Sequence, residues 1–343
     1  MRKGNGMRRA LSYWPALATF VLASSAFAAI DGTVINGTTL KPQPGVPISL
    51  VKPGQNGMQT IGSTTSDAQG HFQFDSDQPG GGPQLLQGTY KGVGYNKMLT
   101  PGTPTKGVEL KVFEASKSPA GAKVSQHMLV VEPSANQLAL SETLLVENEG
   151  NTTYSNDELG GIRFFLPAAA NGKVNVSVKG PAGMPLPRTA KETEEKGVFK
   201  VPFPIKPGET EFDITYSMPL TDPLKFDGRV VGIKGQPAGP LRLVAPKGVT
   251  LESADLKTLG QEPKSQAMIY DVTAAGPFSV NVQGIGSLRG GDDSSGVDTS
   301  DSPQIEAAKP PVYRYLPALI GLALGILGLG LLILYRSSPV RAE

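Results

Sequence analysis

Cysteine is absent from this chain of 343 residues, tryptophan occurs once and histidine only twice. Without cysteine there are no disulfides, no thiol chemistry, no iron–sulfur cluster and no lipid on an N-terminal cysteine. The two histidines, His71 and His127, are too few for a hydrolase zinc site, which needs two histidines and a carboxylate on one metal. We interpret both as surface or loop residues. We expect no enzymatic activity, no catalytic or metal-binding residues and no cofactor.

Charge is also scarce and nearly balanced. Charged residues make up 18% of the chain, with 32 basic against 30 acidic side chains. Four of the basic residues lie among the first nine positions, which leaves 28 basic and 30 acidic residues in the remainder. A protein that binds nucleic acid needs a basic surface to neutralise phosphates. The composition therefore predicts no nucleic-acid partner.

Glycine and proline, in contrast, are abundant, with 42 and 30 residues. This composition is typical of short strands joined by turns and argues against helical bundles and coiled coils. We predict an all-β fold of two consecutive β-sandwich domains, followed by a disordered stalk and one C-terminal transmembrane helix. The first domain is expected at residues 30–115 and the second at residues 123–285.

Residues 1–28 have the features of a secretory signal peptide. A basic start precedes an apolar stretch, and small residues follow that end in the A-x-A pattern Ala26-Phe27-Ala28, which a signal peptidase accepts. We place cleavage after Ala28, with Ala29 as an alternative. An uncleaved N-terminal anchor is the other interpretation of this segment.

Residues 316–335 are twenty consecutive residues without a charge. At about 1.5 Å per residue, a helix of this length matches a hydrocarbon core of about 30 Å, so we predict a transmembrane helix. Basic residues flank it equally, and the signal peptide therefore decides the orientation. Residues 336–343 become a cytoplasmic tail of a single-pass cell-membrane protein, and the ectodomain faces the periplasm or the cell exterior. Gly321 and Gly325 form one GxxxG motif, through which two helices could pair as a homodimer.

Residues 286–313 contain few large apolar side chains and many Asp, Ser, Gly and Pro residues. Such a segment cannot bury a core, and we predict a flexible stalk. Its aspartates do not have the spacing of a calcium-binding loop, so we interpret them as solvated.

Short runs of alternating apolar and polar residues fill the region 30–115. Thr33 and Ile35 belong to one such run, and an Asp–Gly turn leads into Phe72 and Phe74. Because alternate residues of a strand point to the same side, Phe72 and Phe74 should share a buried face.

The same region contains spaced residues of a known sequence pattern: Ile30, Gly32 and Val34, then Gly45, Pro47 and Leu50, then Asp67, Gly70, Phe72 and Phe74, then Gly88 and Tyr90. These residues resemble the carboxypeptidase regulatory-like family, a small transthyretin-like β-sandwich. The resemblance covers about a quarter of the chain and implies a non-catalytic accessory module. Ser66 departs from the family's Thr, and residues 79–83 (PGGGP) lengthen the approach to the next strand.

Alternation of period two also runs through residues 123–285, interrupted by turn signals such as Asn171-Gly172. Eight or nine strands without a convincing helix imply a sandwich or an incomplete barrel. We interpret residues 191–196 (KETEEK) as a solvated loop. The alternating apolar positions are Leu138, Leu140, Leu144 and Val146; Val174, Val176 and Val178; Phe199, Val201, Phe203 and Ile205; Phe212, Ile214, Tyr216 and Met218; and Phe278, Val280 and Val282.

The order of these segments resembles a group of uncharacterised bacterial exported proteins with the same N-terminal module. Two functions agree with it. The first is a non-catalytic, membrane-anchored envelope protein whose ectodomain serves protein–protein interaction or scaffolding through loops or sheet edges. The alternative is a carbohydrate- or cell-wall glycan-binding module, which such sandwiches often carry. Sugars usually stack on exposed aromatic rings, and the only tryptophan, Trp14, lies in the signal peptide, so we favour the protein partner.

Overall fold

The structure is a computed structural model that describes residues 30–54, 57–74, 82–181 and 183–288. The predicted signal peptide, transmembrane helix and cytoplasmic tail lie outside the described residues, as does the stalk beyond residue 288. The described elements are strands, apart from one 3-10 helix, η1 (Ala168–Ala170). In this part of the chain, no helix is long and apolar enough to cross a membrane. The predicted all-β fold class is confirmed for the described residues.

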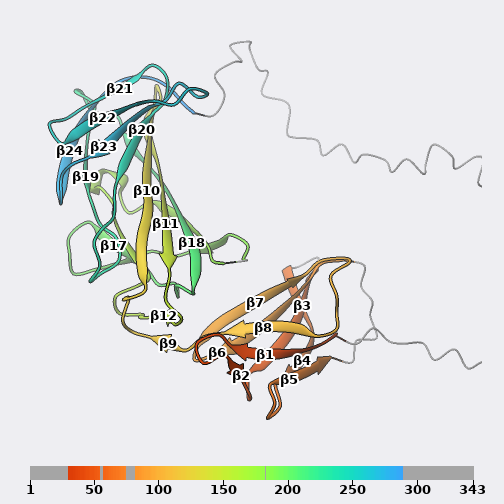
Figure 1. The fold of residues 1–343 in the computed structure, drawn as a ribbon. Coiled ribbons are helices and arrows are strands. Elements are labelled where there is room, and N and C mark those ends of the chain that lie inside the picture. The colour runs from red at the N-terminus through yellow and green to blue at the C-terminus, as the bar shows by residue number, and fades with distance from the viewer. Residues whose placement is uncertain (1–29, 55–56, 75–81, 182, 289–343) are drawn as a thin grey trace, which may run out of the picture. The chain divides into compact units, whose positions relative to one another are not determined.

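Two four-stranded sheets form the N-terminal region, residues 30–114 (Figure 1). The first consists of β1 (Ile30–Asn36), its antiparallel neighbours β2 (Lys41–Pro42) and β5 (His71–Phe74), and the parallel β8 (Val108–Val112). The second has the antiparallel order β4 (Gly57–Thr65), β3 (Pro47–Gly54), β6 (Gln84–Tyr90), β7 (Val93–Leu99).

Side chains from both of these sheets form one hydrophobic cluster, as in a β-sandwich. Phe72 and Phe74 are 4% and 5% exposed, and their rings meet edge to face with centroids 6.1 Å apart. The expectation of a shared buried face is confirmed. In β1, Ile30 and Val34 point into the cluster, whereas Thr33 and Ile35, the alternating residues noted in the sequence, are only half-buried. One inward position of β1 is a glycine, which has no side chain, so the apolar alternation of this strand is not visible in the sequence.

That glycine, Gly32, is required by close packing. A Cβ atom at this position would lie 2.6 Å from the Phe72 ring and 2.0 Å from the Val108 carbonyl oxygen, where no side chain fits. Gly70 closes the turn before β5 with φ of +78°, a conformation that favours glycine. The same turn is held by the Asp67 Oδ1 atom, which accepts hydrogen bonds from the His71 and Gln69 backbone N–H groups at 2.8 and 2.9 Å.

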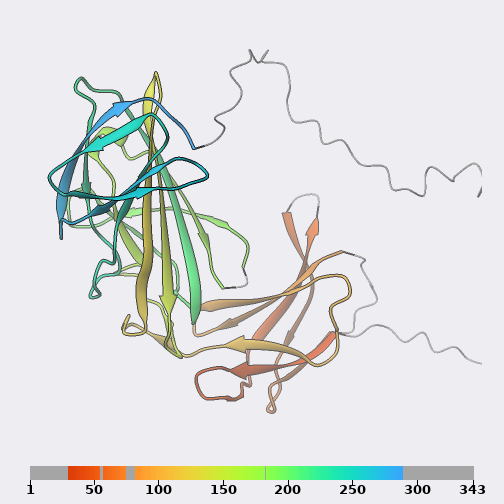
Figure 2. The same cartoon turned by 45° about the horizontal axis from the view of Figure 1, so that its top comes forward.

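The C-terminal region, residues 115–288, is built on an eight-stranded sheet. Its three central strands are twelve residues long and lie side by side in both ribbon views (Figure 1 and Figure 2): β10 (Ala122–Pro133), β11 (Gln137–Asn148) and β18 (Gly208–Pro219). The outer strands are β14 (Val174–Lys179) and β15 (Leu186–Arg188) beyond β18, and β20 (Arg242–Ala245), β23 (Met268–Val272) and β22 (Leu256–Gln261) beyond β10.

Two three-stranded sheets and one short pair complete this region. One sheet has the order β13 (Ile162–Phe165), β17 (Val198–Val201), β16 (Lys191–Glu192), and the other has the order β19 (Lys225–Arg229), β24 (Pro277–Gly284), β21 (Val249–Glu252). The pair consists of β9 (Ala115–Ser116) and β12 (Thr153–Tyr154).

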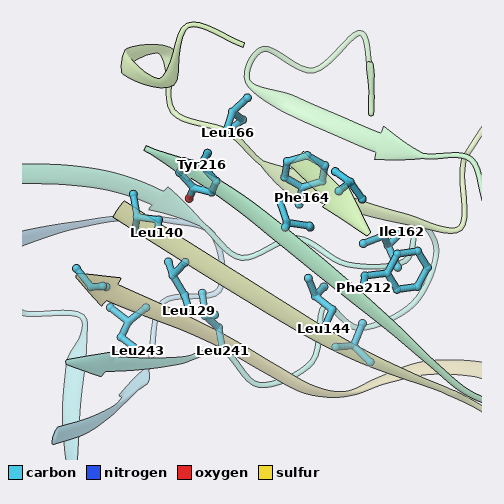
Figure 3. Close-up of a cluster of buried hydrophobic side chains, with 14 of the residues drawn as sticks. Leu129, Leu140, Leu144, Ile162, Phe164, Leu166, Phe212, Tyr216, Leu241 and Leu243 are labelled. Carbon is cyan, nitrogen blue, oxygen red and sulfur yellow. The ribbon is translucent and has the colours of Figure 1, made fainter. Parts of the chain in front are cut away.

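Both three-stranded sheets share one hydrophobic cluster with the eight-stranded sheet. Figure 3 shows side chains of this cluster from three strands: Leu140 and Leu144 of β11, Phe212 of β18, and Ile162 and Phe164 of β13. All five side chains are at most 1% exposed. Burial of this size is the main favourable contribution to folding.

The predicted inward positions of β11, β18 and β24 are confirmed as buried. The predicted number of strands is wrong, because the described residues 122–284 contain fifteen strands, β10 to β24, several of only two to four residues. Strands this short contain too few residues to show an alternation of apolar and polar side chains. For the same reason the run 199–205 is not one strand: β17 ends at Val201 and buries Val198 and Val201, whereas Phe203 lies outside it.

Candidate functional site

The structure separates the two histidines that the sequence offers for chemistry. His71 begins β5 with an exposed side chain, and its Nδ1 atom lies 3.9 Å from the Asp67 carboxylate. His127 is buried in β10, so its interpretation as a surface or loop residue is wrong. The reason is a bulge between Val124 and Gln126, which shifts the register of β10 and turns His127 into the core.

His127 forms a buried pair with Glu142 of β11. The His127 Nε2 atom lies 2.6 Å from Glu142 Oε1, and the two side chains are 2% and 7% exposed. His127 Nδ1 has no hydrogen-bond partner among the described residues. Burial raises the pKa of the neighbouring Tyr216 hydroxyl well above its usual value, and the Glu142 charge adds to the effect. Nowhere in the described part of the chain do three or more His, Cys, Asp or Glu side chains gather as metal ligands.

A groove of about 460 Å³ lies along the β16–β17 hairpin. We call it the β16–β17 groove, and its walls are mainly apolar. They include the half-buried rings of Phe165 and Phe199, with Glu192 and Thr193 contributing polar groups. The complete lining is Phe165, Leu166, Pro167, Ala168, Gly172, Glu192, Thr193, Glu195, Lys196, Gly197, Val198 and Phe199.

Glu195, at one side of this groove, binds three basic side chains. Arg163 and Lys234 donate to its Oε1 atom at 3.1 and 3.2 Å, and Arg229 donates to Oε2 at 3.2 Å. The Lys234 ammonium holds the pKa of the Glu195 carboxyl below its usual value, and Arg229 and Arg163 act in the same direction. The interpretation of residues 191–196 as a solvated loop is therefore wrong in two places, because Lys191 and Glu192 form the strand β16 and Glu195 pairs with three basic side chains outside the hairpin.

The β4 strand is the second candidate surface. It pairs with β3 on one side only, and its side chains from Gly57 to Thr60 are exposed on both faces. Met58 is 54% exposed. Apart from the pairing with β3, no hydrogen bond joins the backbone of β4 to another described residue. Alternate N–H and C=O groups along this strand therefore point outward.

The composition of β4 sets it apart from the other described strands that have one paired side. Its nine residues include no charged residue and no proline. Every other such strand of five or more residues carries a charge, as Lys97 in β7, Glu109 in β8, Asp227 in β19 and Lys257 in β22. Charges on edge strands prevent pairing with other chains. Only β4 combines length with an uncharged edge in this part of the protein.

Sequence reasoning missed both surfaces. The run Gly-Met-Gln-Thr-Ile-Gly-Ser-Thr-Thr (57–65) lacks charge and alternates weakly, which is a usable signal for an edge strand. No comparable signal marks Glu195, because its partners come from two other segments of the chain, Arg163 from β13 and Arg229 and Lys234 from residues 229–234.

No protein-family model matches the chain, and no curated protein matches it. Among solved structures, it resembles three crystal structures of the M1 zinc metallopeptidase from Deinococcus radiodurans. A mutant aligns with a TM-score of 0.27 and 13% identity, and the same mutant bound to a Tyr-Ser-Ala substrate with 0.26 and 15%. The metallopeptidase itself aligns with 0.26 and 14%. Each alignment covers 47% of this chain and 42% of the peptidase chain, so this chain spans less than half of the peptidase's length.

Proposed function

We propose that this chain is a non-catalytic envelope protein, exported and anchored by one helix, whose residues 30–288 bind an envelope protein partner outside the cytoplasm. The uncharged run at residues 316–335 and the signal-like residues 1–28 support the anchoring and the export. The motif residues 30–90 support a carboxypeptidase regulatory-like sandwich as the first of two domains. The observation that carries the binding function is the open, uncharged edge of β4.

The physical argument rests on the backbone of β4. An edge strand offers a row of hydrogen-bonding groups that an extended peptide can satisfy by adding a strand. Main-chain hydrogen bonds then supply affinity, and the exposed Met58, Gln59 and Thr60 side chains supply selectivity. An edge without charges accepts an extended segment of similarly low charge, because no desolvated ion remains in the pair.

A photo-crosslinking amino acid at position 60 tests this surface directly. Thr60 is exposed on β4, and Thr258, exposed on the charged edge strand β22, provides a matched control position. With the full chain produced in its own cells, we expect position 60 to crosslink a defined second protein and position 258 to crosslink far less of it. Substitution of Ser63, exposed on the same strand, by Lys should reduce the crosslink at position 60 at least tenfold.

Equal crosslinking at positions 60 and 258, or none at position 60, would contradict binding at β4. If position 60 crosslinks only to a second copy of this chain, β4 mediates self-association and does not bind a different protein. The location is tested separately, by adding protease to intact spheroplasts. Digestion of residues 30–288 supports the proposed orientation, whereas full protection would refute it.

Glycan binding is the second candidate function, and the β16–β17 groove favours it. Half-buried rings of Phe165 and Phe199 next to Glu192 are a combination of apolar surface and hydrogen-bond acceptors that sugars can use. Pull-down of the purified protein on immobilised cell-wall glycan tests this function. Retention that Phe199→Ser abolishes, while the position-60 crosslink persists, would assign glycan binding to the groove.

A further inference from the structure

A second cleft, of about 520 Å³, contains a lysine without a counter-ion. Lys206 lies on its wall together with Tyr95, Lys97, Leu110 and Lys111. The Lys206 Nζ atom lies 5.1 Å from the centroid of the Tyr95 ring, a cation–π contact. No carboxylate lies within ion-pair distance of this amine among the described residues.

The groups around Lys206 are held in place before any ligand binds. Ile205, the preceding residue, is fully buried and exchanges two backbone hydrogen bonds of 2.9 Å with Tyr154. Pro207 restricts the backbone on the other side. The Tyr95 hydroxyl donates to the Phe113 carbonyl oxygen at 3.0 Å and lies 2.8 Å from Thr153 Oγ1. A preorganised site loses less conformational entropy on binding.

The charges of this cleft do not balance. Lys97, Lys111 and Lys206 face it, and the only acidic side chain of its described lining is Glu109. Glu109 already pairs with Lys111 at 3.4 Å. Two positive charges therefore have no partner in the lining. Burial lowers the pKa of the Lys206 amine to about 8, so the ammonium still predominates at pH 7 although it is poorly solvated.

A further polar group in the cleft lacks a partner. Asn96, which also lines it, has a buried Oδ1 atom that accepts no hydrogen bond from a described residue. A buried acceptor without a donor costs about 1–3 kcal/mol.

We propose that this cleft binds a ligand carboxylate, which pairs with the Lys206 ammonium while a neighbouring apolar group of the ligand packs on the half-buried Phe113. A donor beside the carboxylate would satisfy Asn96. A free organic acid and the C-terminal carboxylate of a peptide share this chemistry. The site is distinct from the β4 edge, so ligand binding in this cleft does not depend on the protein partner proposed for β4.

Three small probes test the proposal by calorimetry with the purified full chain in detergent. N-acetyl-leucine carries a carboxylate, an N–H donor and an apolar side chain, N-acetyl-leucine amide lacks the carboxylate, and 4-methylpentanoate lacks the amide. We expect N-acetyl-leucine to bind at least tenfold more tightly than its amide. If N-acetyl-leucine binds more tightly than 4-methylpentanoate, the natural ligand is a peptide C-terminus. If the two bind equally, it is a free organic acid.

Substitutions connect the binding to Lys206. Lys206→Met keeps the length of the side chain and should weaken the binding of N-acetyl-leucine at least tenfold, whereas Lys247→Met, at an exposed turn, should leave it unchanged. The wild-type affinity should fall about tenfold per pH unit above pH 8, as the amine loses its proton. Four other titratable side chains also face the cleft: Tyr95, Lys97, Glu109 and Lys111. The pH dependence of binding to Lys206→Met separates their effect from that of Lys206.

Nuclear magnetic resonance of the lysine Cε–Hε groups provides an independent measurement. Saturating N-acetyl-leucine should move the titration midpoint of Lys206 upward by at least one pH unit, because the carboxylate favours the charged amine. The proposal is overturned if no probe binds at millimolar concentration, if Lys206→Met binds as well as wild type, or if inorganic phosphate binds as tightly as N-acetyl-leucine.

Discussion

The two regions bury different kinds of side chain. The cluster of the N-terminal region consists of fourteen apolar residues, and its buried polar side chains, Asn36 and Ser66, are uncharged. The C-terminal cluster has thirty-two apolar residues, and ionisable side chains are buried in the same region: His127, Glu142 and Arg163. A larger core can compensate the desolvation of charged groups that a small one cannot.

The difference also concerns how each region is specified. In the N-terminal region, β5 follows from short-range features, namely the turn closed by Gly70 and the two phenylalanines after it, although β1 also pairs with the distant strand β8. In the C-terminal region, basic side chains from distant segments meet at Glu195, and the ionisable His127 and Glu142 pair across the neighbouring strands β10 and β11. We therefore expect substitutions to act through apolar packing in the first region and through charge pairing in the second.

The largest effect should follow from loss of a ring in the small core. Phe72→Ala or Phe74→Ala should lower the free energy of unfolding of the N-terminal region by about 3–5 kcal/mol, because each leaves a cavity. Hydrogen exchange measured by mass spectrometry should show lost protection in β1, β5 and β8, with β10, β11 and β18 unchanged. Unchanged protection in both variants would show that this face is not the core.

Breaking the buried pair of the C-terminal region should cost slightly less. His127→Leu leaves the Glu142 carboxylate buried and alone, and we expect a loss of about 3 kcal/mol. His127→Leu combined with Glu142→Leu removes both polar groups and should recover most of the loss. Chemical denaturation of the four proteins of this cycle measures the coupling. A double variant less stable than His127→Leu would show that the pair does not act as a unit.

Lys206→Met should stabilise the protein by about 1–2 kcal/mol at pH 7, because it removes a desolvated charge. The folded-state pKa of about 8 lies below the unfolded value of 10.5, so the unfolded chain binds more protons between these values. The unfolding free energy of wild type should therefore rise from pH 8 to pH 10, and the advantage of Lys206→Met should shrink over this range. A constant difference between the two proteins would refute the lowered pKa.

The smallest effect is expected at Glu195. Glu195→Gln should cost about 1 kcal/mol or less at pH 7, because the carboxylate is partly exposed and water screens its three ion pairs. Its folded-state pKa lies below the usual carboxyl value, so this stabilisation is present at neutral pH and is lost as the pH falls through the folded-state pKa. Thermal unfolding of both proteins between pH 3 and pH 7 measures the difference. A difference independent of pH would indicate that lost packing, rather than lost charge, is the cause.

A large part of the fold could be predicted from particular residues. The alternation at Leu138 to Leu144 and at Phe212 to Met218 correctly indicated inward faces of long strands. The inward face of β1 was not visible, because Gly32 interrupts the apolar alternation, and prediction failed at His127, where a bulge changes the register. The β4 edge carried a weak signal, whereas the β16–β17 groove and the Lys206 cleft carried none. The domain limits, the signal peptide and the transmembrane helix remain predictions.

The sequence by itself determined the all-β class and the inward faces of the longest strands, because period and turn residues are local properties of the chain. Tertiary structure decided that the edge of β4 stays unpaired, that the Glu195 carboxylate pairs with three basic side chains and that the Lys206 amine is partly desolvated. These features arise where segments far apart in the sequence meet. At Glu195, for example, the carboxylate lies 32 to 39 residues from each of its partners, and no local pattern records such a distance.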